Sequence, residues 1–162
     1  MAKVHKGRYT AAIEGEFVVF LIGMRFNKLW KVHRWMPVFT AMPKMLRVLA
    51  MNPDRGLLGA RLTWAGRTIT SVQYWRSFEH LERFARNTDD PHLEPWRRFN
   101  KKVGASGDVG VFHETFRVQP GNYESIYSNM PTMGLAAAGT HVPIDAARDA
   151  ARQRIAVQAE SP

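Results

Sequence analysis

The sequence predicts one α+β domain of the ferredoxin-like kind, with its elements in the split β-α-β-β-α-β order. Its 162 residues are enough for one hydrophobic core and too few for two independent ones. Apolar residues make up 45% of the chain and aromatic residues 11%, which is the composition of a globular protein. Strand-like and helix-like segments then follow one another along the chain in the split order.

The first predicted strand runs from Glu16 to Phe26, after a polar and basic segment of residues 1–14 that we expect to be a flexible arm. The strand is apolar at consecutive positions rather than at alternate ones, which is typical of a strand covered on both faces. A lone ferredoxin-like sheet carries helices on one face only. We therefore expect a second copy of the chain to cover the other face, giving a homodimer with the architecture of a dimeric α+β barrel.

The next segments predict a helix and then a β-hairpin. Apolar residues recur at helical spacing from Pro37 to Ala50, and this pattern ends at the turn signal of Asn52, Pro53 and Asp54. The two arms of residues 57–75 carry Thr, Ile and Val, and they flank a short turn that contains Gly66. A glycine in a short loop between two such runs predicts a hairpin.

The remaining segments complete the pattern. Ser77 is expected to cap a helix, a second helical piece covers residues 93–103, and a strand covers residues 109–118. These assignments give a single dimeric α+β barrel domain over residues 15–143. Residues 144–162 are expected to form a helical or disordered tail.

The composition excludes several classes of function. Because the chain contains no cysteine, any metal must be held by His, Asp, Glu or a cofactor. The net charge is +9, but the basic residues are dispersed and no base-reading motif accompanies them, so we expect no specific nucleic-acid partner. The longest apolar run, Phe17 to Met24, is far shorter than the ~20 residues that cross a bilayer. We therefore expect a cytoplasmic protein with no membrane partner.

The histidines are the main candidates for chemistry. We interpret four of them as structural or surface residues: His5, His33, His80 and His141. His92 differs because it follows Asp90 and Pro91, a pair that predicts the start of a helix. The helix dipole there favours the neutral imidazole, which leaves a nitrogen available for a metal. An ordinary position on a helix surface remains the alternative for His92.

His113 lies in the middle of the last predicted strand. Because side chains on a strand alternate, it shares a face with Val111 and Thr115, whereas Glu114 points the other way. One interpretation is a core histidine with a hydrogen-bond partner. The other is an acid or base at the wall of an apolar pocket lined by the methionines and aromatic residues of the sheet.

Three segments carry a resemblance to a known family: YWRSFEHL from Tyr74, FHETFRV from Phe112 and YESIYSNMP from Tyr123. Over residues 16–143 the chain resembles an uncharacterised bacterial group of monooxygenase family proteins. The resemblance implies wider relatives among dimeric α+β barrels, namely the antibiotic-biosynthesis monooxygenases, spheroidene monooxygenase and the heme-containing aldoxime dehydratases.

The aldoxime dehydratase pattern implies a cofactor and two site residues. It places a proximal heme ligand in a Pro-rich stretch near the start of a late helix, and a distal catalytic histidine in a following strand that reads His-Glu. Here His92 after Pro91, and His113 before Glu114, match these places at a separation of 21 positions. The resemblance therefore implies heme b, with His92 on the iron and His113 as the catalytic proton donor or acceptor.

The sequence leaves two alternatives to a heme-dependent oxidoreductase or lyase with a small apolar substrate. One is a cofactor-free monooxygenase of the antibiotic-biosynthesis kind, in which an apolar pocket desolvates an activated phenol or enol, His113 is the base and His92 is structural. The other is a non-catalytic, ligand-binding dimer. In the heme case, arginines would neutralise the propionates, and the candidates are Arg25, Arg61, Arg76 and Arg117.

Overall fold

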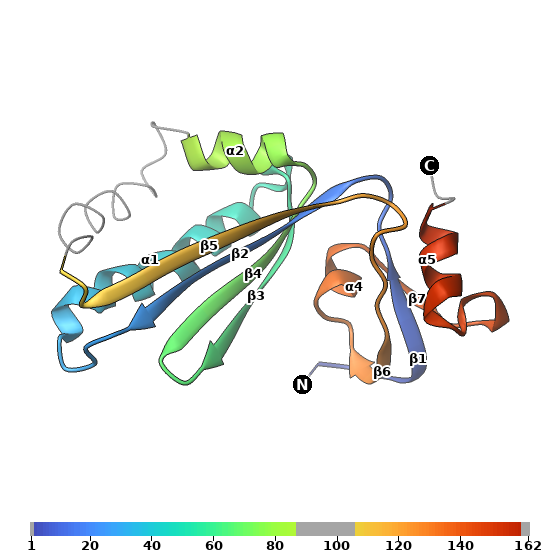
Figure 1. The fold of residues 1–162 in the computed structure, drawn as a ribbon, viewed down its shortest axis with the longest axis horizontal. Coiled ribbons are helices and arrows are strands. Elements are labelled where there is room, and N and C mark those ends of the chain that lie inside the picture. Colours follow the sequence, from blue (N-terminus) through green and yellow to red (C-terminus); the bar gives the residue numbers. More distant parts are fainter. Residues whose placement is uncertain (1, 87–105, 160–162) are drawn as a thin grey trace.

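A four-stranded antiparallel sheet in the order β3-β4-β2-β5 forms the centre of the fold (Figure 1). The computed structural model describes residues 2–86 and 106–159. The strands are β2 (Phe17–Phe26), β3 (Leu57–Ala65), β4 (Thr68–Trp75) and β5 (Val109–Val118). Together with the chain order β2-α1-β3-β4-α2-β5, this arrangement is that of a ferredoxin-like domain. The fold class predicted from the sequence is confirmed.

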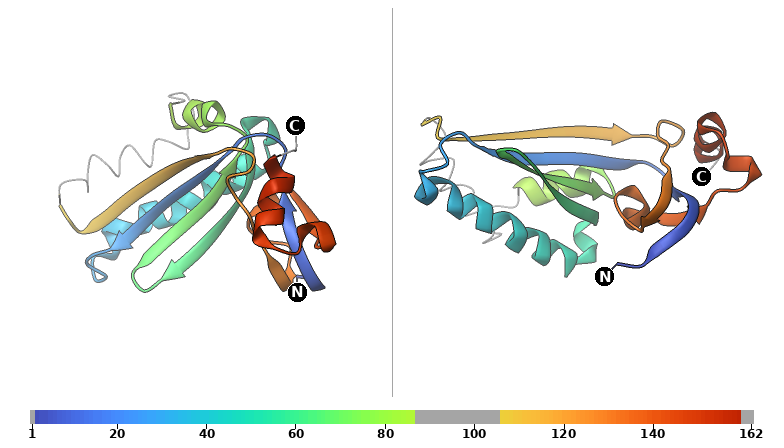
Figure 2. Two further views of the ribbon diagram at one scale, coloured as in Figure 1. Left: turned by 45° about the vertical axis from the view of Figure 1, so that its right-hand side comes forward. Right: turned by 90° about the horizontal axis from the view of Figure 1, so that it is seen from below.

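Two helices, α1 (Val32–Ala50) and α2 (Phe78–Arg86), cover the same face of this sheet (Figure 2). The core between them brings together residues of both helices and two strands: Val18, Leu49, Trp75 and Leu81. The side chain of Ser77 accepts a hydrogen bond from the backbone N–H of His80 at 3.4 Å, which agrees with the predicted N-cap. The predicted helical piece over residues 93–103 lies outside the described residues.

The hairpin of β3 and β4 agrees with the sequence, whereas α1 is longer than predicted. Gly66 in the hairpin turn has a φ of 57°, a left-handed conformation that suits glycine. Helix α1 begins at Val32 and contains Pro37 and Pro43, although Pro37 was expected to be its first residue. A proline removes one helical hydrogen bond, and tertiary packing at this end, where the rings of Trp35 and Phe26 lie 4.8 Å apart, holds the helix in place.

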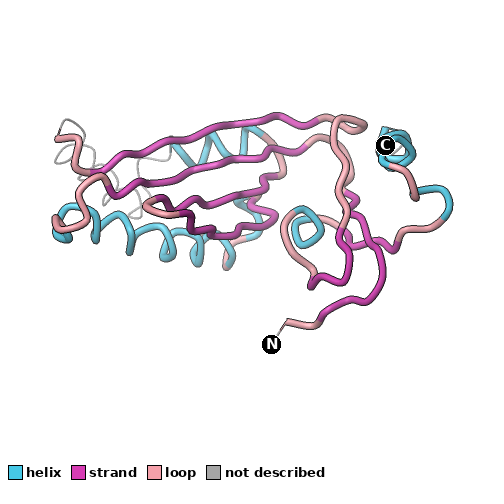
Figure 3. Tube along the Cα trace, turned by 60° about the horizontal axis from the view of Figure 1, so that its bottom comes forward, coloured by secondary structure: helices cyan, strands magenta, loops and turns pink. Residues whose placement is uncertain are grey.

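A second, three-stranded sheet in the order β6-β1-β7 lies beyond one end of the main sheet (Figure 3). It consists of β1 (Val4–Ala12), β6 (Tyr127–Pro131) and β7 (Thr140–Pro143), with the short helix α4 (Leu135–Ala138) between the last two. Residues 4–12 are therefore a paired strand and not the flexible arm that we expected. Local sequence could not show this pairing, because both partner strands lie more than a hundred residues away.

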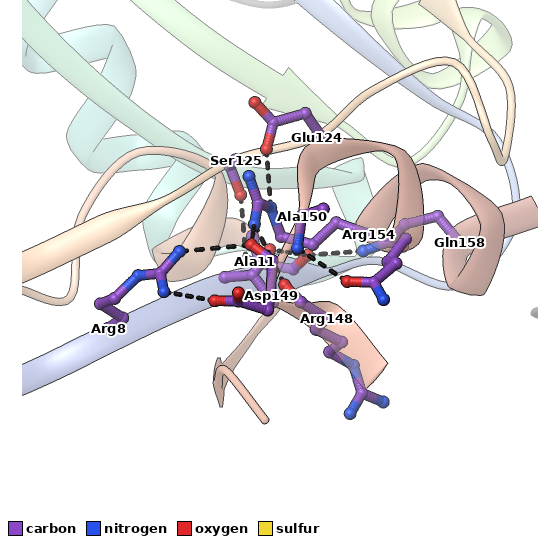
Figure 4. A network of polar contacts seen from close by, with 11 residues as sticks. Arg8, Ala11, Glu124, Ser125, Arg148, Asp149, Ala150, Arg154 and Gln158 are labelled. Atoms are coloured by element: carbon purple, nitrogen blue, oxygen red, sulfur yellow. Dashed lines mark hydrogen bonds and ion pairs between the residues drawn. The ribbon is translucent and has the colours of Figure 1, made fainter. Parts of the chain in front are cut away.

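The C-terminal segment packs against this small sheet through polar side chains (Figure 4). A 3-10 turn, η2 (Ala146–Arg148), precedes helix α5 (Ala151–Ala159), which contributes the buried side chains of Arg154 and Gln158. The other 3-10 turn, η1 (Pro53–Arg55), lies between α1 and β3. Arg154 donates to Glu124 at 2.8 Å, and Gln158 donates to the carbonyl of Ala11 at 2.7 Å. The expected tail thus contains a helix that is fixed to β1.

The second face of β2 is covered in part by the chain itself. Phe17, at the start of β2, is buried against Ala11 of β1 and Leu135 and Ala136 of α4. Farther along the sheet the same face carries four apolar side chains without such cover from the described residues: Leu21, Val72, Phe112 and Phe116. The consecutive apolar run in β2 therefore has an intramolecular explanation at one end. Along the rest of the face, these apolar side chains lie among the charged residues Arg25, Arg61 and Glu114.

Candidate active site

A largely apolar pocket of about 340 Å³ lies between the main sheet and helices α1 and α2. Its apolar lining comes from β2, α1 and α2, and consists of Phe20, Ile22, Val38, Ala41, Met42, Met45, Phe78, Leu81, Phe84 and Ala85. Its polar lining residues are Gln73, Glu82, Arg86, His113 and Thr115. A concave apolar site with a few polar groups is the usual form of a site for a small molecule.

His113 stands at the wall of this pocket. It pairs with Ile22 of β2, and its ring centroid lies 5.8 Å from that of Phe20, so the imidazole is on the face that carries the helices. Glu114 pairs with Leu21 and points to the opposite face, as the alternation predicted. His113 is exposed, so it is not the buried core histidine that the sequence left open. It is the only imidazole in the part of the pocket lining that the structure describes.

A buried hydrogen-bonded chain forms the polar part of the pocket floor. The indole nitrogen of Trp75 donates to the side-chain oxygen of Gln73 at 3.0 Å, and the side-chain nitrogen of Gln73 donates to the hydroxyl of Ser71 at 3.2 Å. Because an indole can only donate, it fixes the orientation of the Gln73 amide. The second N–H of this amide takes no part in the chain of hydrogen bonds.

The second predicted site residue, His92, lies outside the described residues, and so do Asp90 and Pro91. The structure therefore does not describe where His92 lies relative to His113 and the pocket. The role of His92 as a heme ligand stays a prediction. In the described chain no group of three or more His, Asp or Glu side chains could hold a bare metal ion.

The arginines expected near a cofactor lie elsewhere. Arg25 pairs with Thr68, and Arg61 pairs with Val72, so both project from the face opposite the pocket. Arg117 donates to Glu16 at 3.3 Å. The arginine that lines the pocket is Arg86, which sequence analysis did not single out; it forms an ion pair of 2.9 Å with Glu82, one helical turn earlier.

A cluster outside the pocket contains two histidines that are far apart in the sequence, His5 and His141. His141 of β7 stacks on Tyr9 of β1 at 4.3 Å, and its ring lies 4.9 Å from that of His5. The hydroxyl of Thr132 lies 3.3 Å from a ring nitrogen of each histidine. Burial, and secondly the neighbouring His5, lower the pKa of His141 below its usual value. This cluster is on the small sheet and does not line the pocket.

None of the helices in the described ranges has the length and apolar character needed to cross a membrane. The fold and the pocket together define a ferredoxin-like α+β domain with an apolar site between its sheet and its helices.

The chain belongs to the monooxygenase af470-like family, whose family model matches residues 17–135. It is 31% identical to monooxygenase af470 of Aspergillus fumigatus strain Af293, in an alignment that covers 80% of this chain and 53% of that protein. The chain therefore spans about half the length of this curated relative. The matched residues run from β2 through the pocket to the start of α4.

Two solved structures share the fold. An aldoxime dehydratase in complex with butyraldoxime superposes with a TM-score of 0.62 at 16% identity, over 95% of this chain and 44% of that one. A second aldoxime dehydratase structure gives a TM-score of 0.58 at 16% identity, over 94% of this chain and 44% of that one. At this identity the similarity concerns the fold alone.

Proposed function

We propose that this protein is a heme-dependent oxidoreductase or lyase that binds a small apolar substrate in the pocket between the sheet and helices α1 and α2. The observation that carries the proposal is the position of His113, an exposed imidazole at the wall of a pocket whose other surfaces are mostly apolar. A histidine in such a place can give a proton to a bound substrate or take one from it.

The pocket supplies substrate binding and exclusion of water. The side chains of Met42, Met45 and Phe84 offer apolar contact area, and the flexible methionines adapt to ligands of different shape. Gln73 and Thr115 offer the few polar contacts that would orient a substrate oxygen or nitrogen beside His113. The substrate class that matches this lining is a small, mainly apolar molecule with one polar reacting group.

The residues of the pocket fit heme chemically. Its walls provide the apolar surface that a porphyrin needs, and Arg86 provides a cation for a propionate. On the resemblance to the aldoxime dehydratases, we propose that His92 would hold the heme iron and that His113 would act on the bound substrate. When bound, heme would supply a Lewis-acidic and redox-active iron centre. His113 would then hold or move the proton at the reacting atom.

A cofactor-free monooxygenase is the second candidate, and membership of the monooxygenase af470-like family favours it. In this case the apolar pocket desolvates an activated phenol or enol, His113 removes its proton, and His92 has a structural role. A dimer that binds a ligand without catalysis is the remaining alternative. All three functions use the same pocket, and they differ in whether heme is bound and whether His113 changes turnover.

The test is heme reconstitution of the wild type and of three histidine variants. We expect a Soret band near ~400–420 nm for the wild type, loss of heme in His92→Ala, and retained heme with turnover about 10²–10⁴ lower in His113→Ala. His33→Ala, which removes an exposed histidine of α1 outside the pocket lining, is the matched control and should resemble the wild type. Activity would be measured on small oximes, peroxide and phenolic substrates.

The outcomes distinguish the candidate functions and test the roles assigned to His92 and His113. A wild type that never takes up heme, but loses activity on a phenolic substrate in His113→Ala, would favour the cofactor-free monooxygenase. Heme uptake that is unaffected by His92→Ala would contradict the ligand assignment. Turnover that is unaffected by His113→Ala would contradict the catalytic role that carries the proposal.

A further inference from the structure

Exposed apolar side chains gather at one end of the main sheet, the end farthest from the small sheet (Figure 1). Here β2 runs into α1 and β3 turns into β4. Trp30 is 74% exposed and Trp64 is 65% exposed. Three further exposed apolar residues accompany Trp30 in the same stretch: Leu29, Val32 and Met36. Large apolar side chains at such exposure are unusual in a solvated surface.

These exposed residues lie at the same end of the main sheet, and we call them the apolar tip (Leu29, Trp30, Val32, Met36 and Trp64). Trp64 packs on Phe26 with ring centroids 5.9 Å apart, and Phe26 packs on Trp35 at 4.8 Å. The indole nitrogen of Trp35 donates to the carbonyl of Leu29 at 3.1 Å. Trp64 is therefore held against a ring cluster, and Trp35 of the same cluster holds the backbone of Leu29, the neighbour of Trp30.

The surroundings of the apolar tip are basic. Residues 17–78 contain ten of the 23 Lys and Arg residues and a single acidic residue, Asp54, so the formal net charge of +9 arises in this stretch. Arg25 and Arg67 are exposed beside the tip, where the N–H of Phe26 donates to the carbonyl of Arg67 at 2.9 Å. Asp108 is the acid at this end among the described residues, and it is buried between Lys28 and Lys31.

We propose that the apolar tip docks on an anionic lipid surface. Tryptophan and leucine enter the boundary between headgroups and acyl chains, while Lys and Arg around them reach lipid phosphates. Each basic residue near an anionic leaflet adds attraction that salt weakens. Nucleic acid is the other common partner of a basic surface, and Trp30 and Trp64 offer rings on which bases stack. We favour lipid because Leu29, Val32 and Met36, which gain nothing from a base, gain from burial in the acyl boundary. This proposal departs from the expectation, drawn from the sequence, that the protein has no membrane partner.

The tip also leads toward the candidate active site. A small cavity of about 80 Å³ shares Ile22, Val38 and Met42 with the main pocket and extends along β3 and β4 to Leu62 and Ile69. Docking would place the lining of this cavity next to the lipid phase, in which an apolar substrate dissolves. This consequence rests on the proposed function, whereas docking itself does not.

Vesicle flotation tests the docking without heme or turnover. The full chain would be mixed with vesicles of phosphatidylcholine alone, or of phosphatidylcholine with phosphatidylglycerol, at low and at physiological salt. We expect flotation only with the anionic vesicles and less of it as salt rises. Trp30→Ala should lower the partition coefficient about tenfold, and Arg67→Glu at least about fivefold.

Matched controls come from the far parts of the fold. Met51→Ser removes an equally exposed apolar side chain at the other end of α1, and Arg152→Glu reverses an exposed charge on α5; both should bind as the wild type does. Absence of binding to anionic vesicles at low salt would overturn the proposal. So would equal losses in the tip variants and the controls, or binding to single-stranded DNA that the tip variants abolish while vesicles stay unbound.

Discussion

The buried indole of Trp75 donates a hydrogen bond of 3.0 Å to the side-chain oxygen of Gln73. Both residues belong to β4 and lie two positions apart, so their side chains are on the same face of the sheet. Gln73 lines the pocket, whereas Trp75 lies in the core with Val18, Leu49 and Leu81. The pair therefore connects the stability of the core to the geometry of the candidate site.

The first prediction is that Gln73→Leu destabilises the protein by about 1–3 kcal/mol, although leucine matches glutamine in size. The substitution leaves the Trp75 indole and the Ser71 hydroxyl buried without their partner, and an unsatisfied buried polar group costs this amount. Urea unfolding would measure the change. Thr115→Val alters an exposed residue of the same pocket and should stay within about 0.5 kcal/mol of the wild type. Equal stabilities for the two variants would contradict the role assigned to Gln73.

Local patterns in the sequence predicted the main sheet well. The alternation and β-branched content of residues 109–118 predicted the bounds of β5, and Gly66 predicted the hairpin turn. The face of His113 followed from the same alternation. These features depend on neighbours within a few residues, so a single sequence contains the information.

Contacts between distant residues could not be predicted in the same way. Strand β1 is recognisable only through its pairing with β6 and β7, and Gln158 is buried because it donates to Ala11, 147 positions earlier. The presence of Arg86 in the pocket depends on how α2 lies on the sheet, and no local pattern specifies that. The contact between the rings of His5 and His141 likewise depends on the packing of segments that are distant in the sequence.

The second prediction concerns this pair. Burial and His5 lower the pKa of His141, so the folded protein binds a proton there less tightly than the unfolded chain. The contribution of His141 to stability is present above its ordinary pKa of about 6.5 and is lost as the pH falls through the lowered value. We expect the hydrogen-exchange protection factors of the β1 and β7 amides, which correct for the intrinsic pH dependence of exchange, to fall as the pH is lowered from about 7 to about 5.

His141→Phe should remove much of this pH dependence, because phenylalanine keeps the stacking on Tyr9 and cannot be protonated. His33→Ala, at an exposed position of α1, should retain it. An unchanged pH dependence in His141→Phe would assign the effect to another group of the cluster.

The third prediction concerns Asp108 at the start of β5. Hydrogen bonds from Lys28 and Lys31 lower the pKa of Asp108 to about 2, and its backbone carbonyl accepts from the N–H groups of Asn27 and Lys28. A carboxyl with a lowered pKa contributes stability above its ordinary pKa of about 3.9, and this stability is lost as the pH falls toward the lowered value. Asp108 therefore holds the loop before α1 against β5.

Asp108→Asn should lower the thermal midpoint at pH 7 and flatten the loss of stability between about pH 4 and pH 2. Glu14→Gln removes an exposed carboxylate and should leave both quantities near the wild-type values. Calorimetry across this pH range would measure the thermal midpoint and its dependence on pH. An unchanged acid transition in Asp108→Asn would mean that other carboxyl groups determine it.

The last prediction is a homodimer in which the open faces of two main sheets meet. This face carries Leu21, Val72, Phe112 and Phe116, and the ring of Phe112 lies across Gly23, where a Cβ atom would come within 2.4 Å of it. Phe116→Lys should raise the dissociation constant at least ~30-fold, the effect of losing a side chain worth about 2 kcal/mol at an interface. Met51→Lys, at the exposed position that follows α1, should leave the dissociation constant unchanged. Sedimentation equilibrium of the wild type and both variants would decide, and a monomeric wild type at micromolar concentration would contradict the dimer.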